Sequence, residues 1–285
     1  MALKNFSKTW KILKKDKVTI IGALFMAILV MVSFVGPLFI PYSKAFTPDL
    51  SKVLKPPGVG LLGTDELGRD LLARIAWGGR VSLLIGLGSV LIGTIAGVII
   101  GLLAGYYPQS KLSTLAIRSM DILLAFPRIL LAIFLITILG PGVISLSIAI
   151  GISTIPSFAR MTRASTLIIR NALYVESAQA AGLQNSMILW RHILPNITSP
   201  IIVQFTLSVG QAILMGSGLS FLGLGPQPPM AEWGLMIAQA RVNLFNAPRL
   251  MIVPGVCLII ITLGLNMLGD SLRDAIDPTL RGEIT

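Results

Sequence analysis

Six long apolar segments dominate the sequence, and each is long enough to cross a lipid bilayer as a helix. They cover residues 18–40, 81–106, 113–139, 143–161, 197–222 and 249–269. A helix needs about 20 mostly apolar residues to span the hydrocarbon core. A spanning helix also satisfies its own backbone hydrogen bonds, which lipid cannot do. The segments therefore predict an all-α integral membrane protein with six transmembrane helices.

The charge content agrees with a chain surrounded by lipid. Only 12% of the residues are charged, whereas an ordinary soluble domain has about 25%. The net charge of +11 raises the alternative of nucleic-acid binding, which requires basic residues clustered on a polar face with aromatic side chains. Outside the N-terminus the sequence has no such cluster. We therefore expect the chain to contact the lipid bilayer and no nucleic acid.

The basic residues also predict the orientation of the chain. Six lysines precede residue 18, and the apolar segment after them is too long for a signal peptide and has no clear cleavage site. We interpret this segment as a retained signal anchor. Lys and Arg favour the cytoplasmic side, and most of them fall there if the N-terminus is inside. Both termini are then cytoplasmic, and residues 41–80 form an extracytoplasmic linker.

Small residues recur every four positions in two apolar segments. The second segment contains Gly93, Gly97, Gly101 and Gly105. The fifth contains Ser208, Ala212, Gly216 and Ser220. Residues four apart share one helix face, and a smooth face lets helices approach closely in a membrane. Such a face predicts either tight packing within one bundle or a sliding contact with a second transmembrane chain.

The third apolar segment carries charges that lipid disfavours. Arg118 and Asp121 lie three positions apart near its cytoplasmic end, which predicts a local ion pair. Arg128 lies deeper and follows Pro127, a residue that can kink a helix. The guanidinium of Arg128 either pairs with an acidic residue elsewhere or lines a polar path, where it could meet a peptide carboxylate. Arg128 and Asp121 are thus the candidates for a translocation path.

The sequence has none of the residue groupings that carry catalysis or cofactor binding. It lacks the G-x-x-x-x-G-K-[ST] loop that holds ATP. Its single histidine, His192, and its single cysteine, Cys257, are too few for a zinc site. The stretch GVGLLG at residues 58–63 fits G-x-G-x-x-G but follows KPP in a loop, where a dinucleotide site would need a strand. We predict a non-enzymatic chain that binds no metal or cofactor.

A polar stretch interrupts the chain between the fourth and fifth apolar segments. Helix-forming residues fill positions 163–181, and Gly182 is a natural helix stop. Asn185 or Ser186 can cap a second short helix, and Pro195 suits the first turn of the fifth segment. The pattern predicts a bent helix–turn–helix on the cytoplasmic surface. An exposed short helix of this kind can dock in a partner's groove.

Four separated motifs resemble those of one transporter family. The pattern E-x-A-x-x-x-G, followed by HILP at residues 192–195, resembles the EAA loop of type I ABC importer permeases. It is formed by Glu176, Ala178 and Gly182, with Ser177 where alanine is usual. Three further stretches resemble the C-type permease subunit of dipeptide, oligopeptide and nickel importers, at residues 62–87, 218–241 and 266–282. The resemblance covers nearly the whole chain.

The resemblance implies a type I ABC importer permease fold with a cytoplasmic EAA coupling loop. A five-helix permease core over residues 81–272 would carry the coupling loop at residues 162–195. Residues 1–17 and 273–285 would be cytoplasmic tails, and residues 18–40 the first transmembrane helix. The ATPase-coupling residues would be Tyr174, Glu176, Ala178, Ala181, Gly182 and Leu183.

The resemblance also implies partners and a function. Such a permease forms a heterodimer with a homologous permease subunit and takes its energy from two ATPase subunits that bind ATP and Mg. It receives substrate from an extracytoplasmic solute-binding protein. The chain would supply half of a path for dipeptides or oligopeptides across a bacterial cytoplasmic (inner) membrane. Nickel or glutathione are alternative substrates within the subfamily, and a stand-alone secondary transporter is the alternative from another class.

Overall fold

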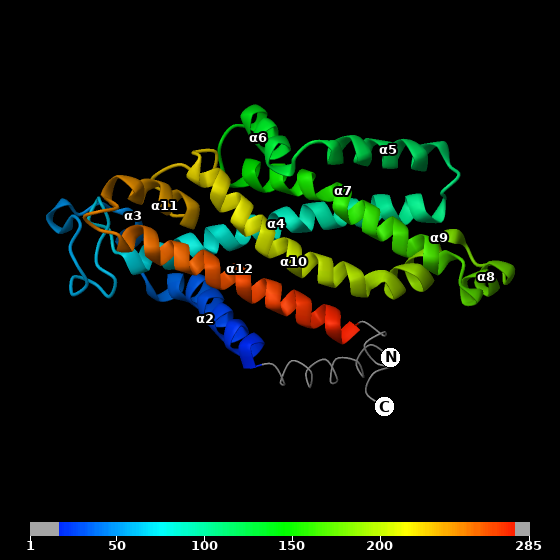
Figure 1. Cartoon of the computed structure of the whole chain (residues 1–285), viewed down its shortest axis with the longest axis horizontal. Helices are drawn as coiled ribbons and strands as arrows, with labels where there is room; N and C mark the ends of the chain where they lie inside the picture. Colours follow the sequence, from blue (N-terminus) through cyan, green and yellow to red (C-terminus); the bar gives the residue numbers. More distant parts are fainter. Residues whose placement is uncertain (1–16, 277–285) are drawn as a thin grey trace.

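The computed structural model describes residues 17–276, which form an elongated bundle of long helices (Figure 1). The long helices are α2 (Lys17–Phe39), α4 (Leu71–Tyr106), α7 (Val143–Arg170), α10 (Leu194–Phe221) and α12 (Arg249–Ile276). Within the described residues, five helical stretches are long and apolar enough to cross a membrane, or six if one broken pair counts as a span. The predicted all-α membrane fold is confirmed.

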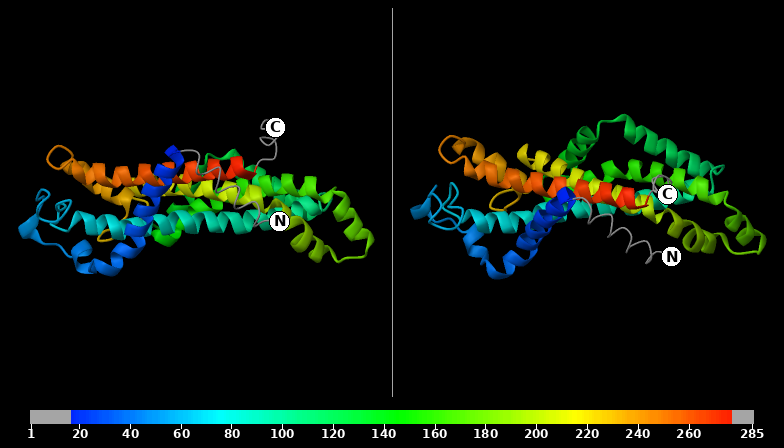
Figure 2. Two further views of the ribbon diagram at one scale, coloured as in Figure 1. Left: turned by 90° about the horizontal axis from the view of Figure 1, so that it is seen from below. Right: turned by 60° about the horizontal axis from the view of Figure 1, so that its bottom comes forward.

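Shorter elements connect the long helices. They are α3 (Tyr42–Phe46), η1 (Leu50–Lys52), α5 (Lys111–Ala125), α6 (Arg128–Leu139), α8 (Leu173–Ala180), α9 (Asn185–Met187), η2 (Ile188–Ile193), α11 (Trp233–Ala240) and η3 (Arg241–Asn243). The loops around α3 and α11 lie together at one end of the bundle, called here the α11 end. The segment with α8 and α9 lies at the opposite end, called here the α8 end. Figure 2 shows α2 lying obliquely across α12 and α4.

The third predicted span is not one continuous helix, which corrects the sequence prediction. The helices α5 and α6 are bent by 97° relative to each other. The break falls at Phe126, whose backbone is extended with φ −89° and ψ 137°. Proline disfavours a helical conformation in the residue before it, so Pro127 ends α5 and starts a new helix. Counted together as one broken span, the two halves bring the number of spans in the described residues to six.

Helix α4 begins ten residues before the apolar segment that predicted it. The side chain of Asp70 accepts a hydrogen bond of 2.8 Å from the backbone N–H of Ala73 and so caps the helix N-terminus. The first turns contain Arg74 and Arg80. These charges kept residues 71–80 out of the predicted apolar segment, although the residues are helical. The last ten residues of the predicted linker, 71–80, therefore belong to the bundle.

The glycine strip of α4 packs against α7, and the two helices run parallel. The residues of α7 that face the four glycines recur with the same spacing of four: Thr154, Phe158, Thr162 and Thr166. A Cβ atom placed on Gly101 would lie 2.7 Å from the Cβ of Thr162, a contact that side chains do not tolerate. This placement within one chain favours tight packing over a sliding contact with a second chain.

Candidate functional site

The segment at the α8 end is anchored by its own apolar core. Val175 of α8 and Ile188 of η2 are fully buried and cluster with Leu102 near the end of α4. This packing explains why the predicted helix over residues 163–181 is wrong as a single helix. The chain leaves the helical conformation at Ala172, where ψ is 140°. The break turns α8 so that its apolar side reaches the core.

Gly182 ends α8 in the left-handed conformation, with φ +78°. The N–H of Leu183 donates to the carbonyl of Ala178 at 3.2 Å, and the N–H of Gly182 donates to Gln179 at 2.9 Å. This pattern satisfies carbonyls that a helix end leaves open. A Cβ atom on Gly182 would meet nothing within 4 Å. The turn therefore requires glycine for its backbone conformation and not for lack of space.

The hydroxyl of Tyr106 ties the end of α4 to this segment. It donates to the Oδ1 atom of Asn185 at 2.7 Å and accepts a bond of 3.4 Å from the Nε2 atom of Gln179. The predicted capping role of Asn185 or Ser186 is wrong, because both residues lie inside α9 and Gln184 occupies the cap position without a side-chain cap bond. The sequence pattern did not reveal Tyr106, since its partner lies 79 residues away.

The outer surface of this segment is exposed and partly apolar. Trp190, Met187 and Leu173 are exposed large hydrophobic side chains, and a surface hollow beside Trp190 has a volume of about 430 Å³. Of the predicted coupling residues, Ala178 is buried and Leu183 is half-buried, while the rest are exposed: Tyr174, Glu176, Ala181 and Gly182. The surface has the features of a docking site for another macromolecule.

A π-helical turn, η2, joins α9 to α10. Pro195 lies in the first turn of α10, as predicted. A π turn inserts an extra residue into the helical register and is frequent at functional sites. Here it lets Ile188 and Ile193 both point into the anchoring core, where neither is exposed, while Trp190 between them faces outward. The exposed surface is therefore held on a fixed base.

The predicted path residues have partners that the sequence did not indicate. Asp121 of α5 accepts a bond of 2.8 Å from the guanidinium of Arg160 on α7, so the predicted pairing of Asp121 with Arg118 is wrong. Arg128 donates to the Oε1 atom of Gln211 on α10 at 3.4 Å. Its Nε atom is buried and has no partner among residues 17–276.

A buried ion cluster holds the loops at the α11 end. The Oδ2 atom of Asp65 lies 2.7 Å from Nε of Arg69 and 3.3 Å from Nε of Arg74, and all three side chains are buried. Arg74 also donates to the carbonyl of Ala45 at 3.3 Å and to Gln239 of α11 at 3.1 Å. One carboxylate thus joins the linker, α4 and α11 in a single hydrogen-bonded unit.

A second buried carboxylate fixes the start of α11. Glu232 accepts bonds from the backbone N–H groups of Gly234 at 3.0 Å and Leu235 at 2.8 Å. The hydroxyls of Ser82 on α4 and Ser217 on α10 donate to the same carboxylate at 3.0 and 3.2 Å. Four donors satisfy this buried group without a cation. The loop 223–232 is therefore locked between two spanning helices.

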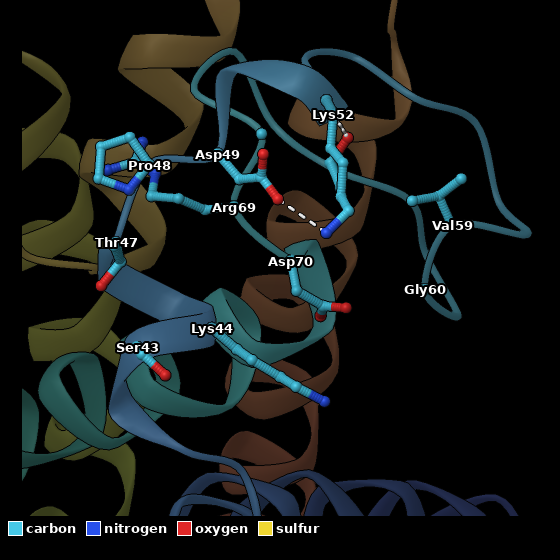
Figure 3. A pocket seen from close by; sticks show the side chains of 12 residues that line it. Ser43, Lys44, Thr47, Pro48, Asp49, Lys52, Val59, Gly60, Arg69 and Asp70 are labelled. Carbon is cyan, nitrogen blue, oxygen red and sulfur yellow. Dashed lines mark hydrogen bonds and ion pairs between the residues drawn. The ribbon is translucent and has the colours of Figure 1, made fainter.

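A polar cavity of about 490 Å³ opens within the linker before α4, and all of its lining residues lie between positions 43 and 70 (Figure 3). Lys44, Asp49 and Asp70 contribute charged side chains to it. Lys52 donates to Asp49 at 2.7 Å, and this bond, aided by Ser51, lowers the pKa of Asp49 to about 2. The carboxylate of Asp49 is therefore ionised at physiological pH. Among residues 17–276, no three His, Cys, Asp or Glu side chains are grouped so as to hold a metal ion.

Comparisons with known proteins cover nearly the whole chain. The family model for binding-protein-dependent transport system inner membrane components matches residues 97–282. A second model, for the N-terminal transmembrane domain of oligopeptide transport permease C, matches residues 5–57. Both models fit the resemblance that the motifs indicated, and the predicted family is confirmed.

Individual relatives are similar over almost their full length. The di/tripeptide transport system permease protein DppC of Pseudomonas aeruginosa is 43% identical over 98% of this chain and 93% of its own. The dipeptide permease protein DppC of Alkalihalophilus pseudofirmus is 40% identical over 98% and 92%. The glutathione transport system permease protein GsiD of Pectobacterium atrosepticum is 41% identical over 95% and 90%.

The fold also matches solved structures. An inward-facing form of the MetNI methionine ABC transporter superimposes with a TM-score of 0.58 over 73% of this chain and 97% of that chain, at 20% sequence identity. A second crystal form of the same transporter gives a TM-score of 0.55 over 70% and 95%. At this identity the likeness shows a shared fold.

Proposed function

The chain belongs to the family of binding-protein-dependent transport system inner membrane components, and we propose that it is the C-type permease subunit of an ATP-driven importer of dipeptides or oligopeptides. The observation that carries the proposal is the exposed, rigidly anchored surface of the α8 segment. Because the chain has no ATP-binding loop, it needs a docking surface of this kind to couple transport to ATP hydrolysis in a partner subunit. The relatives named for dipeptide and di/tripeptide transport support the substrate class.

We infer that the α8 segment transmits the movement of an ATPase subunit to α4. The Tyr106–Asn185 bond and the buried side chain of Val175 connect the segment to the end of that helix. The glycine strip then joins α4 to α7. Because closely packed helices deform little, a displacement at the α8 end would move α4 and α7 together. Glu176 is exposed at this end, where it could meet a basic group of the ATPase.

Arg128 is the group that we propose for substrate contact in the path. Its only hydrogen-bond partner among residues 17–276 is the neutral side chain of Gln211, so its charge is not neutralised there. A guanidinium binds a carboxylate through two parallel charge-assisted bonds. The carboxylate at the end of a peptide has this chemistry. Asp121 already pairs with Arg160. It would therefore line the path without offering an unpaired charge to the substrate.

The remaining parts of the assembly follow from the family. We propose that a homologous permease subunit completes the path, that two ATPase subunits bind ATP and Mg, and that a solute-binding protein docks at the α11 end. The chain itself would catalyse no reaction and bind no cofactor. From the positive-inside rule we propose that the α8 segment and both termini lie in the bacterial cytoplasm. The ion cluster around Asp65 would give the solute-binding protein a rigid surface.

Reconstitution in lipid vesicles tests the proposal. Vesicles that contain the permease pair, the ATPases and the solute-binding protein should accumulate labelled dipeptide only with ATP. Vesicles that contain this chain alone should show no uptake, and uptake by the chain alone would establish a secondary transporter instead. Similarity to a glutathione permease makes glutathione the second candidate substrate. A competition panel of peptides, glutathione and a nickel chelate decides among the substrates.

A further inference from the structure

A small basic cavity lies between α4, α5 and α7 near the α8 end of the bundle. Its volume is about 110 Å³, which holds several water molecules and is enough for a tetrahedral phosphate group. The cavity is lined by the guanidinium-bearing residues Arg118 and Arg163 and by the hydroxyl-bearing residues Ser113 and Thr114. The guanidiniums of Arg118 and Arg163 and the hydroxyl of Ser113 can donate hydrogen bonds to an oxyanion, whereas the hydroxyl of Thr114 donates to the carbonyl of Ser110 at 3.2 Å.

The charge of this cavity is not balanced by the protein. Asp121, the acidic residue of α5, is paired with Arg160 at 2.8 Å. Among residues 17–276, neither Arg118 nor Arg163 forms an ion pair. The Nε atom of Arg163 is buried and has no hydrogen-bond partner in that part of the chain. A buried donor without a partner is costly, so the cavity favours an anionic ligand.

The position of the cavity matches the level of lipid headgroups. Arg163 lies about 30 Å along α7 from Val143, which is about the thickness of the hydrocarbon core. The exposed apolar side chains of Leu115 and Ile122 lie within one helical turn of Arg118 on α5. They form an apolar surface directly beside the basic cavity. An acyl chain lying on this surface would bring its own headgroup to the two arginines.

We propose that the Arg118–Arg163 cavity binds the phosphodiester of an anionic phospholipid, with its acyl chains against Leu115 and Ile122 of α5. Basic pockets between transmembrane helices are suited to anionic headgroups. Such a lipid would bridge α5 to α7 beside the Asp121–Arg160 pair, at the half of the broken span that leads into the bend. The inference goes beyond the proposed function and does not require that peptides are the substrate.

The test measures lipid retention by the transporter purified with its partner subunits. The complex is equilibrated with vesicles of phosphatidylglycerol and phosphatidylcholine in equal amounts and returned to detergent, and the bound phospholipid is identified by mass spectrometry. The wild type should retain more phosphatidylglycerol than phosphatidylcholine. The variant Arg118→Gln/Arg163→Gln should retain it about tenfold less, because charge-assisted bonds of this kind are worth at least one factor of ten.

Three controls make the result decisive. Arg273→Gln removes an exposed charge from α12 outside the cavity and should retain lipid as the wild type does. Arg118→Lys/Arg163→Lys keeps the charge and should retain phosphatidylglycerol above the glutamine variant. Excess inorganic phosphate should not displace the lipid, since phosphate has no acyl chains. Equal retention by the wild type and the glutamine variant, or full displacement by phosphate, would overturn the proposal without affecting the proposed transport function.

Discussion

A Cβ atom on Gly97 of α4 would lie 2.5 Å from the Cβ of Phe158 on α7, closer than side-chain atoms approach each other in folded proteins. Phe158 is fully buried and cannot move aside without opening the core. The helices α4 and α7 therefore pack through backbone and small side chains over this stretch.

Gly97→Ala should destabilise the protein because the added methyl group forces these two helices apart. Overpacking of this kind costs about 1–3 kcal/mol. The matched control is Gly88→Ala on the same helix, where the new Cβ would come no closer than 3.9 Å to a neighbour, the hydroxyl of Ser147. Thermal unfolding in detergent should show a lower midpoint for Gly97→Ala alone. Equal midpoints would mean that the helices can separate at no cost.

The conformation of Gly182, and not the space around it, should govern ATPase coupling. Its φ of +78° is unfavourable for a β-branched residue, although a Cβ atom there would meet no neighbour. Gly182→Val should therefore lower ATP-dependent uptake while the protein remains in the membrane. Gly182→Asn, which tolerates this conformation better, should keep more activity despite its similar size. The measurement compares the ATP-dependent uptake rates of the two variants. Faster uptake by Gly182→Val than by Gly182→Asn would mean that side-chain size, and not backbone conformation, causes the effect.

The Tyr106 hydroxyl should contribute to coupling more than to stability. Tyr106→Phe keeps the buried ring and removes the bonds to Asn185 and Gln179, a loss of about 1 kcal/mol for a typical hydrogen bond. We expect more ATP hydrolysed per peptide imported by reconstituted transporter, because the α8 segment would shift without α4. Tyr107→Phe, on the adjacent exposed ring, is the control. An unchanged ratio in both variants would remove Tyr106 from the coupling route.

The carboxylate of Asp65 should be important for the loops at the α11 end. Asp65→Asn leaves the buried guanidiniums of Arg69 and Arg74 without their shared counter-charge. Removing one partner of a buried ion pair costs about 3–5 kcal/mol. Asp49→Asn breaks an exposed ion pair and should change the unfolding midpoint little. Limited proteolysis of the linker should be faster in Asp65→Asn only, and resistance equal to the wild type would show that the cluster is dispensable.

The fold could be predicted from the sequence because lipid imposes a simple requirement on length and polarity. The apolar segments located the five long helices, and Gly182 and Pro195 located a turn and a helix start. The predicted start of helix α4 was ten residues too late, because the charge of Arg74 suggested a solvent-exposed loop. In the structure Arg74 is buried and its charge is balanced by Asp65. The sharp break at Phe126 was predicted only as a kink at Pro127, since the size of a bend depends on packing.

Pairings between distant residues account for the rest of what the sequence did not predict. Tyr106 meets Asn185, and Asp121 meets Arg160, across separations that no local pattern encodes. The local rule for charges three positions apart suggested Arg118 as the partner of Asp121. That rule holds for an isolated helix, and here the neighbouring helix α7 offers a closer guanidinium. Sites built from several helices therefore required the three-dimensional structure.

Arg128 should recognise the carboxylate end of a peptide during transport. We expect Arg128→Met to import a peptide with a free C-terminus more slowly, because the two charge-assisted bonds are lost, and to import the same peptide with an amidated C-terminus at a nearly unchanged rate. The solute-binding protein has its own preference between the two peptides, but the same protein serves the wild type and the variant, so this preference cancels when the free-to-amidated rate ratio of the variant is compared with that of the wild type. Arg128→Lys keeps a charge and should give an intermediate ratio. A ratio equal to that of the wild type, in a complex that assembles normally, would leave Arg128 with only its structural contact to Gln211.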